Sequence, residues 1–180
     1  VDDDTGDSFT YSLVSGTGDD DNGSFGISGD NLITNAIFDY ETKDTYSILV
    51  RSTTVGDGQW IEKAFVITVT DVNEAPTDIA LSNSTIAENQ PVNTVVGTLS
   101  TTDPDAGETF TYSLVAGTGS DDNSSFNISG TSLRSSEVFD VETKSSYSIR
   151  VRSSDGALSF DEIFTITVTF SNQPPTDIAL

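Results

Sequence analysis

The side chains with the clearest chemical potential in this sequence are carboxylates, which recur in short motifs. Two acids separated by one residue occur in Asp103-Pro104-Asp105 and in Asp140-Val141-Glu142, and an Asp precedes Gly in Asp155-Gly156. A further acidic stretch, Asp71-Val72-Asn73-Glu74, ends shortly before Pro76. Carboxylate and amide oxygens are the ligands that hard cations such as Ca²⁺ prefer. Whether these motifs act together depends on the elements that carry them.

The composition excludes several classes of function. Asp and Glu number 29 against 7 Lys and Arg, which gives a net charge of −22. Nucleic acids and anionic membranes need a basic face, so we expect neither as a partner. The sequence has no His and no Cys, which removes the usual general base, the usual zinc ligands and disulfides. We therefore expect no enzymatic activity, and no apolar run approaches the ~20 residues that insert into a membrane.

The chain contains an internal repeat. Phe38–Lys43 returns 101 residues later as Phe139–Lys144, and Pro76–Leu81 returns 99 residues later as Pro175–Leu180. Self-similarity at this period indicates tandem domains. Because the sequence has no Met, we also expect the chain to begin inside a longer protein.

The phase of the repeat predicts four segments. The first, 1–70, is a repeat without its first two strands, and the second, 71–75, is a linker. The third, 76–170, is a complete repeat. The last, 171–180, is a linker followed by the first strand of another repeat.

Hydrophobic periodicity predicts strands throughout the complete repeat. Apolar and polar residues alternate over 110–114, 147–152 and 164–168, and shorter alternating runs occur near residues 79, 97, 126 and 133. Alternation over β-branched and aromatic residues is typical of strands with one buried face. About seven short strands in about 100 residues predict an all-β fold of tandem immunoglobulin-like Greek-key β-sandwiches.

The strand order predicts which carboxylates meet. Consecutive strands run antiparallel, so the acidic loops fall alternately at the two ends of each sandwich, and the linker joins two such ends. The ligands expected at this junction between the repeats are Asp39, Glu41, Asp71, Asn73, Glu74, Asp103, Asp105 and Asp155. We expect two or three Ca²⁺ ions, because such a cluster repels itself and Ca²⁺ accepts six to eight oxygen ligands in tolerant geometry.

These motifs resemble those of the cadherin repeat, especially the bacterial cadherin-like repeats of large surface or secreted proteins. Ala87-Glu88-Asn89 is similar to the first calcium motif of that family. Asp103–Gly107, Asp140–Glu142, Asp71–Pro76 and Asp155-Gly156 are similar to the others, in the same order. The resemblance implies a calcium-rigidified extracellular spacer or adhesion repeat, with adjacent repeats of the same protein as partners.

The sequence departs from the family motifs at several positions. Glu74 replaces an Asp of the linker motif, and Ala75 replaces an Asn, which by analogy removes one ligand. The second linker, Phe170–Pro174, contains no acid, so we expect a weak or absent site there. The further candidate ligands, which would face other repeats at the outer ends, are Glu88, Asp140, Glu142, Asn172, Asp2, Asp4 and Asp57.

Other interpretations of the sequence remain open. A polysaccharide-binding module would need a flat strip of aromatic side chains, for which Trp60 and Phe160 are candidates. Another alternative is a self-associating module in which identical repeats bind in trans. Separately, Thr176–Leu180 could pair as a donated strand with the gap in a neighbouring molecule. The acidic runs at 19–23 and 121–123 lack the glycine, the glutamate and the helices of an EF-hand, and we expect them to be solvated turns.

Overall fold

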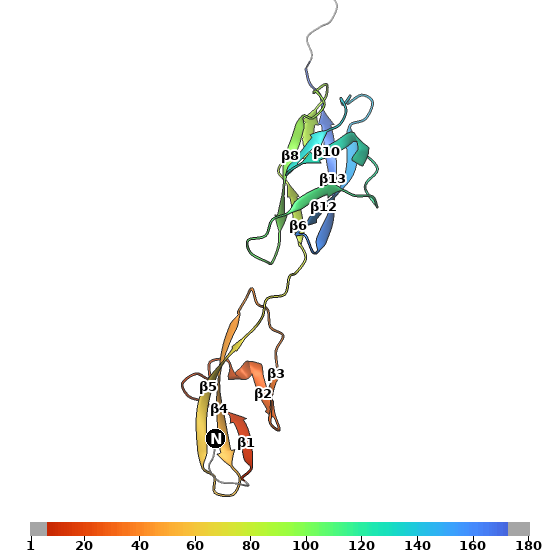
Figure 1. Cartoon of the computed structure of the whole chain (residues 1–180). Helices are drawn as coiled ribbons and strands as arrows, with labels where there is room; N and C mark the ends of the chain where they lie inside the picture. The colour runs from red at the N-terminus through yellow and green to blue at the C-terminus, as the bar shows by residue number, and fades with distance from the viewer. Residues whose placement is uncertain (1–6, 173–180) are drawn as a thin grey trace, which may run out of the picture. The chain divides into compact units, whose positions relative to one another are not determined.

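The computed structural model describes residues 7–172, and it divides the chain into two compact units, Val1–Val72 and Asn73–Leu180. They are called unit 1 and unit 2 below, and each is described by itself (Figure 1). Both consist of strands, with one short 3₁₀ turn each, Asn22–Ser24 (η1) and Asn123–Ser125 (η2). In the described part of the chain, no helix is long and apolar enough to cross a membrane.

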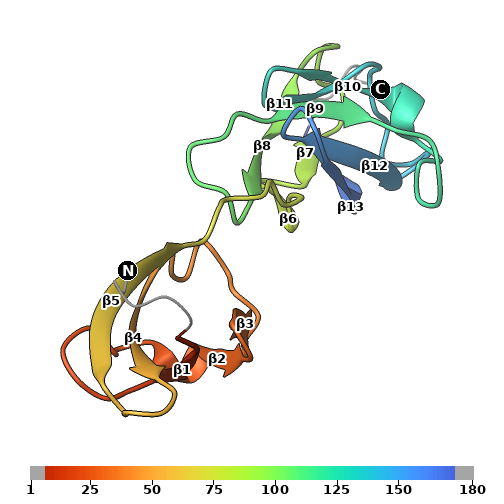
Figure 2. The ribbon, with the colours of Figure 1, turned by 60° about the horizontal axis from the view of Figure 1, so that its bottom comes forward.

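Unit 2 is a sandwich of two four-stranded sheets. One sheet has the order β10-β11-β8-β6 and the other β7-β13-β12-β9, and the two form the layers seen in Figures 1 and 2. The strands are β6 (Asp78–Leu81), β7 (Thr85–Ala87), β8 (Val95–Thr102), β9 (Thr111–Leu114), β10 (Phe126–Ser129), β11 (Ser132–Ser135), β12 (Ser146–Ser154) and β13 (Ser159–Thr169). The expected all-β sandwich is confirmed.

The alternating residues of unit 2 form its core. Ile149 and Val151 on β12 and Ile166 and Val168 on β13 are buried, and their neighbours in sequence point away from the core. Ile79 on β6 contributes from the opposite sheet. Burying such a side chain contributes roughly 1.5–3 kcal/mol, so the period of two in the sequence fixes which face of each sheet is inside.

The first strand of unit 2 is divided between the two sheets. β6 pairs antiparallel with β8, whereas β7 pairs parallel with β13. The sequence did not predict β7, because three residues are too few for a periodic pattern. Where the chain passes from one sheet to the other it crosses β8 at Gly97, whose Cβ, if present, would lie 2.5 Å from the carbonyl oxygen of Asn83.

Unit 1 repeats part of this architecture. Its strands are β1 (Phe9–Leu13), β2 (Phe25–Ser28), β3 (Asn31–Thr34), β4 (Thr45–Thr54) and β5 (Trp60–Thr68), in sheets β1-β4-β5 and β2-β3. An aromatic cluster recurs in both units with nearly the same ring separations. The rings of Phe38 and Tyr46 lie 4.7 Å apart, as do those of Phe139 and Tyr147. The repeat therefore extends from sequence to packing.

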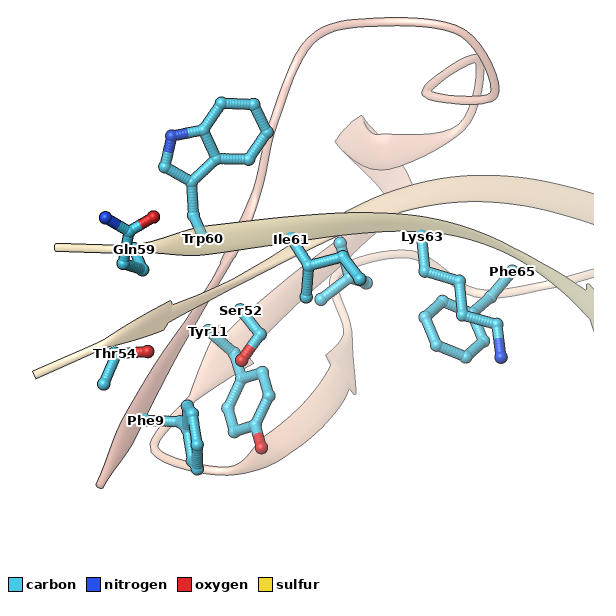
Figure 3. A pocket seen from close by; sticks show the side chains of 10 residues that line it. Phe9, Tyr11, Ser52, Thr54, Gln59, Trp60, Ile61, Lys63 and Phe65 are labelled. Carbon is cyan, nitrogen blue, oxygen red and sulfur yellow. The ribbon is translucent and has the colours of Figure 1, made fainter. Parts of the chain in front are cut away.

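One face of the unit 1 sheet is open. Among the described residues, unit 1 has no strands that correspond to β6–β8 of unit 2. The open face forms a groove of about 830 Å³ lined by residues that include Tyr11, Ser52 and Phe65 (Figure 3). In unit 2, the equivalent Tyr112 and Ser153 hydrogen-bond to Thr101 of β8, at 2.8 and 2.6 Å. The same positions are thus core in one unit and surface in the other.

The sequence predicted that the acidic turns after β1 and β9 are solvated. The structure shows instead that they anchor the neighbouring sheet. The backbone N–H of Ser148 donates to Asp122 Oδ2 (2.8 Å), and Lys144 Nζ donates to Asp122 Oδ1 (2.5 Å). The N–H of Arg150 donates to Asn123 Oδ1 (2.9 Å). The equivalent bonds in unit 1 join Asp21 to Ser47 and Lys43, and Asn22 to Leu49. These acids therefore serve the fold, which disfavours an ion site there.

Candidate metal centres

The loop between β8 and β9 gathers three carboxylates within unit 2. Asp103, Asp105 and Glu108 each place one oxygen within 4.8 Å of the others, and all three residues are half-buried. The N–H of Asp105 donates to Asp103 Oδ1 (3.0 Å), which fixes the turn. Asp103 Oδ2 and Asp105 Oδ1 are buried and have no hydrogen-bond partner. A buried carboxylate oxygen without a donor is costly, so a bound cation at this loop would relieve that cost.

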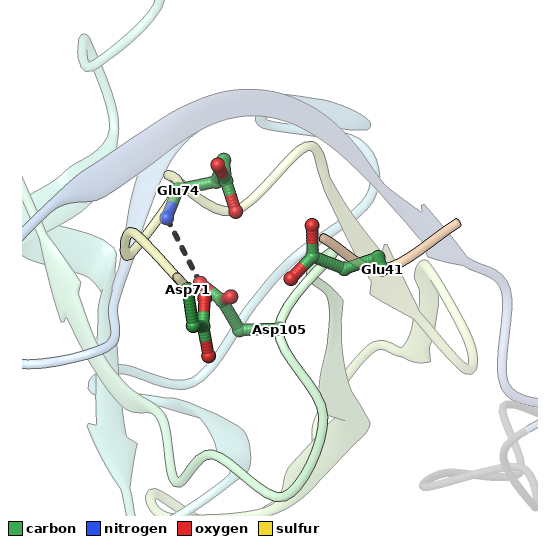
Figure 4. A group of neighbouring side chains, drawn as sticks. All are labelled: Glu41, Asp71, Glu74 and Asp105. Atoms are coloured by element: carbon green, nitrogen blue, oxygen red, sulfur yellow. Dashed lines mark hydrogen bonds between the residues drawn. The ribbon is translucent and has the colours of Figure 1, made fainter. Parts of the chain in front are cut away.

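The beginning of unit 2 lies against this loop. The N–H of Glu74 donates to Asp105 Oδ2 (2.9 Å), as the dashed line in Figure 4 shows, and Asn73 Nδ2 donates to Asp155 Oδ2 (3.1 Å). Antiparallel strands place the β8–β9 loop and the β12–β13 turn at one end of the sandwich. The structure therefore brings five predicted residues together in unit 2: Asn73, Glu74, Asp103, Asp105 and Asp155. Their role as metal ligands stays a prediction.

Asp155 is held as a carboxylate by its own turn. The N–H groups of Leu158 and Ala157 donate to Asp155 Oδ1, both at 2.6 Å. These two donors, together with Asn73, hold the pKa of Asp155 below its usual value. The group therefore stays charged at neutral pH and can attract a cation.

Three other predicted ligands belong to unit 1. Asp39 accepts hydrogen bonds from the hydroxyl (3.0 Å) and the N–H (3.1 Å) of Thr42, which lower the pKa of Asp39. The N–H of Val69 donates to the carbonyl of Asp44 (2.8 Å), so this turn lies beside the end of β5, which Asp71 follows. Glu41 and Asp71 are both exposed. Unit 1 thus presents acids at the end from which the chain leaves it.

A second acidic group lies at the other end of unit 2. Glu88, Asp140 and Glu142 each place one oxygen within 4.8 Å of the others. Glu88 is only 5% exposed, and its two oxygens accept the N–H groups of Ser171 (3.1 Å) and Val141 (3.3 Å). A hydrogen bond with Asp140 and the charge of Glu88 raise the pKa of Glu142. Because both of its oxygens accept backbone N–H groups, Glu88 has a structural role at this end of unit 2.

The remaining candidate ligands lie outside the groups of neighbouring acids found among the described residues. Asn172 is exposed at the end of the described chain, and Asp57 accepts the N–H of Gln59 (3.0 Å) in the β4–β5 turn. Asp2 and Asp4 lie outside the described residues, as does the expected strand at 176–180.

Sequence reasoning missed Glu108. It lies three residues after Asp105, beside the motif rather than within it. The available signal was an acid directly after Gly107, whose positive φ of 87° turns the chain between Asp105 and Glu108. All the groups gathered in these clusters are oxygen donors, which fits Ca²⁺ and disfavours the softer metals that prefer nitrogen or sulfur ligands.

Comparison with known proteins agrees with the fold. The cadherin domain model matches residues 82–171, half of the chain. A human protocadherin-24 EC1-2 structure (Form II) has a TM-score of 0.71 and 19% identity, over 96% of this chain and 85% of that one. A protocadherin gammaB7 EC3-6 cis-dimer structure has a TM-score of 0.62 and 24% identity, over 92% of this chain and 41% of that one.

A third structure, PcdhgB3 EC1-4 in 50 mM HEPES, has a TM-score of 0.66 and 21% identity, over 91% of this chain. The chain spans 41% of the length of that structure, and none of the curated proteins compared with it matches. At these identities the structures show the shared fold, and the domain model shows the family. The chain therefore belongs to the cadherin domain family, whose members are extracellular, non-enzymatic adhesion repeats.

Proposed function

We propose that this chain is a calcium-rigidified spacer or adhesion repeat of a larger cell-surface or secreted protein. The observation that carries the proposal is the pair of buried oxygens, Asp103 Oδ2 and Asp105 Oδ1, that have no hydrogen-bond donor. They lie in a loop that also contacts the first residues of unit 2. Two or three Ca²⁺ ions would bind at the junction through Asp39, Glu41, Asp71, Asn73, Glu74, Asp103, Asp105 and Asp155.

Electrostatics gives the proposed ions their effect. Two carboxylates ~4 Å apart repel by about 1 kcal/mol in water and by about 4 kcal/mol near a protein surface. The chain carries a net charge of −22, so it offers little compensation of its own. Each Ca²⁺ brings two positive charges and six to eight coordination positions, which turns mutual repulsion into mutual attraction.

The connecting segment explains why binding would stiffen the chain. Residues 71–76 form no strand, and the ladder with β8 begins at Thr77, whose N–H donates to the carbonyl of Thr102 (2.8 Å). Asp71 belongs to unit 1 and Asn73 to unit 2, only two residues further along the chain. An ion that takes ligands from both units and from the segment removes the freedom of the segment. Without the ion, the segment acts as a flexible linker.

The second linker is proposed to bind Ca²⁺ more weakly. Its residues 170–173 contain no acid, and both oxygens of Glu88 already accept backbone N–H groups. A cation there would compete with these hydrogen bonds. We therefore expect the ions at the 71–75 segment to dominate any calcium response.

Thermal melting tests the proposal. The full chain is melted with Ca²⁺ and with excess chelator, alongside a D103N/D105N double variant and an E137Q control, in which an exposed Glu outside the clusters loses its charge. At Ca²⁺ about 100-fold above Kd, linkage predicts about 2.7 kcal/mol of stabilisation, a rise of several degrees. The rise should persist in E137Q and vanish in the double variant. An equal melting temperature with and without Ca²⁺ would reject the proposal.

Self-association is a second candidate, supported by one of the structures to which this chain is similar. The protocadherin gammaB7 structure is itself a cis-dimer. Sedimentation in Ca²⁺ over a range of chain concentrations tests this candidate, and a sedimentation coefficient independent of concentration would exclude it.

Polysaccharide binding receives less support from the geometry. Trp60 is exposed and stacks with the guanidinium of Arg51, 4.4 Å from the ring centroid. Its ring lies on the other side of β5 from the ring of Tyr11 (Figure 3). These two aromatic side chains therefore do not share one flat strip on which a sugar chain would stack.

A further inference from the structure

We propose that Asn22 in unit 1 is a deamidation site that the folded chain protects and that unfolding exposes. Asn22 is the only asparagine in the sequence that is followed by a glycine. In deamidation, the backbone nitrogen of the following residue attacks the carbonyl carbon of the asparagine side chain. Glycine has no Cβ and the widest choice of backbone conformations, so it hinders this attack least. The site includes none of the proposed metal ligands.

The reaction needs only water as a co-reactant. The backbone nitrogen of Gly23 gives up its proton to solvent and forms a bond to Cγ of Asn22. The bond between Cγ and Nδ2 then breaks, and Nδ2 takes up a proton and leaves as ammonia. Water adds to either carbonyl carbon of the resulting succinimide ring and opens it. The products are aspartate and isoaspartate, which both add a negative charge, and isoaspartate also lengthens the backbone by a CH₂ group.

The fold of unit 1 holds both ends of the Asn22 amide. Asn22 Nδ2 donates to the carbonyl of Val14 (2.8 Å), and the N–H of Leu49 donates to Asn22 Oδ1 (3.0 Å). Asn22 also begins the η1 turn. In a helical backbone the side chain tilts towards the N-terminus, away from the nitrogen that would attack it. Deamidation therefore requires that the turn opens and that both hydrogen bonds break.

Unit 2 contains the same turn without the reactive pair. Asn123 Nδ2 donates to the carbonyl of Val115 (2.9 Å), and Asn123 Oδ1 accepts the N–H of Arg150 (2.9 Å), but the next residue is Ser124. Gly23 has open space at its Cβ position and no positive φ. Neither packing nor backbone conformation requires a glycine there, so the two turns differ in chemical lability and share their structure.

Deamidation would prevent unit 1 from rebuilding this turn. The carbonyl oxygen of Val14 lies 2.8 Å from Asn22 Nδ2, and an aspartate would place an oxygen without a proton at that point. An acceptor would then face an acceptor, and a hydrogen bond that anchors the turn would be lost. Unit 1 should therefore open more often after the reaction, so that one unfolding event favours the next.

Peptide mass spectrometry of the full chain tests the proposal, after incubation at mildly alkaline pH with and without denaturing urea. In urea we expect Asn22 to deamidate several-fold faster than Asn123 of the same chain, and without urea both should remain amides. G23S, which copies the sequence of unit 2, should slow Asn22 in urea to the rate of Asn123. Equal rates at Asn22 with and without urea would overturn the protection, and equal rates at Asn22 and Asn123 in urea would overturn the role of Gly23.

Thermal melting of N22D and G23S tests the consequence for the fold. N22D has the same side chain as one reaction product and should melt several degrees below wild type. G23S changes only the neighbouring residue at an open position and should melt as wild type does. Equal melting temperatures for N22D and G23S would overturn the claim that deamidation weakens unit 1.

Discussion

Replacing Asp122 by Ala is expected to destabilise unit 2 by about 2–3 kcal/mol. The half-buried carboxylate accepts the N–H of Ser148 on β12 (2.8 Å) and pairs with Lys144 (2.5 Å). Burial alone would raise the pKa of Asp122, but the hydrogen bonds from Lys144 and Ser148 outweigh it and lower the pKa. A hydrogen bond to a charged group contributes ~1.5–3 kcal/mol, and its loss leaves an N–H without a partner. The exposed lysine adds little, because solvent screens it.

Thermal and urea unfolding in chelator measure this effect without a contribution from bound metal. A loss of 2–3 kcal/mol lowers the melting temperature of a domain of about 100 residues by roughly 10 °C or more. D121A is the matched control, because Asp121 is next to Asp122 in the sequence but is exposed. This variant should change the free energy of unfolding by less than about 0.5 kcal/mol. Equal melting temperatures for D122A and D121A would refute the anchoring role of the turn.

Two further predictions concern the strands. Arg152, with Arg150, lowers the pKa of Asp161 to about 2. The contribution of Asp161 to stability is therefore complete above the ordinary carboxyl pKa of about 3.9 and disappears as pH falls towards 2. Urea unfolding between pH 5 and pH 2 should show a smaller loss of unfolding free energy in D161N than in wild type. Replacing Gly97 by Ala places a Cβ 2.5 Å from a backbone oxygen and should lower the free energy of urea unfolding by about 1–3 kcal/mol. The control is G23A, at a position with open space around the Cβ. Equal losses of unfolding free energy in the two variants would contradict the crowding at β8.

The sequence predicts the sandwich because burial follows the period of the strands. Ile149 and Val151 alternate with polar neighbours, and the structure buries both. The division of the first strand between two sheets was not predictable, since β7 owes its place to parallel pairing with β13. That pairing depends on tertiary contacts, and a three-residue segment carries no periodic signal of its own.

The candidate metal site likewise has features that the sequence predicts and features that it does not. Strand direction alone predicts that the Asp103–Asp105 loop and Asp155 share one end of unit 2, and Asn73 and Glu74 do contact them. Glu108 was missed because its closeness to the aspartates depends on the turn at Gly107. The role of Asp122 was misjudged because its partner, Ser148, is 26 residues away in the sequence.

Small-angle X-ray scattering of the full chain tests the central claim most directly, at fixed ionic strength, with Ca²⁺ and then with excess chelator. Calcium-dependent stiffening predicts one well-defined maximum dimension with Ca²⁺ and a broader distribution of dimensions in chelator, with D103N/D105N showing the broad distribution in both. Identical scattering of wild type under the two conditions would contradict the claim, and the acidic motifs would then have no part in the stiffness of the chain.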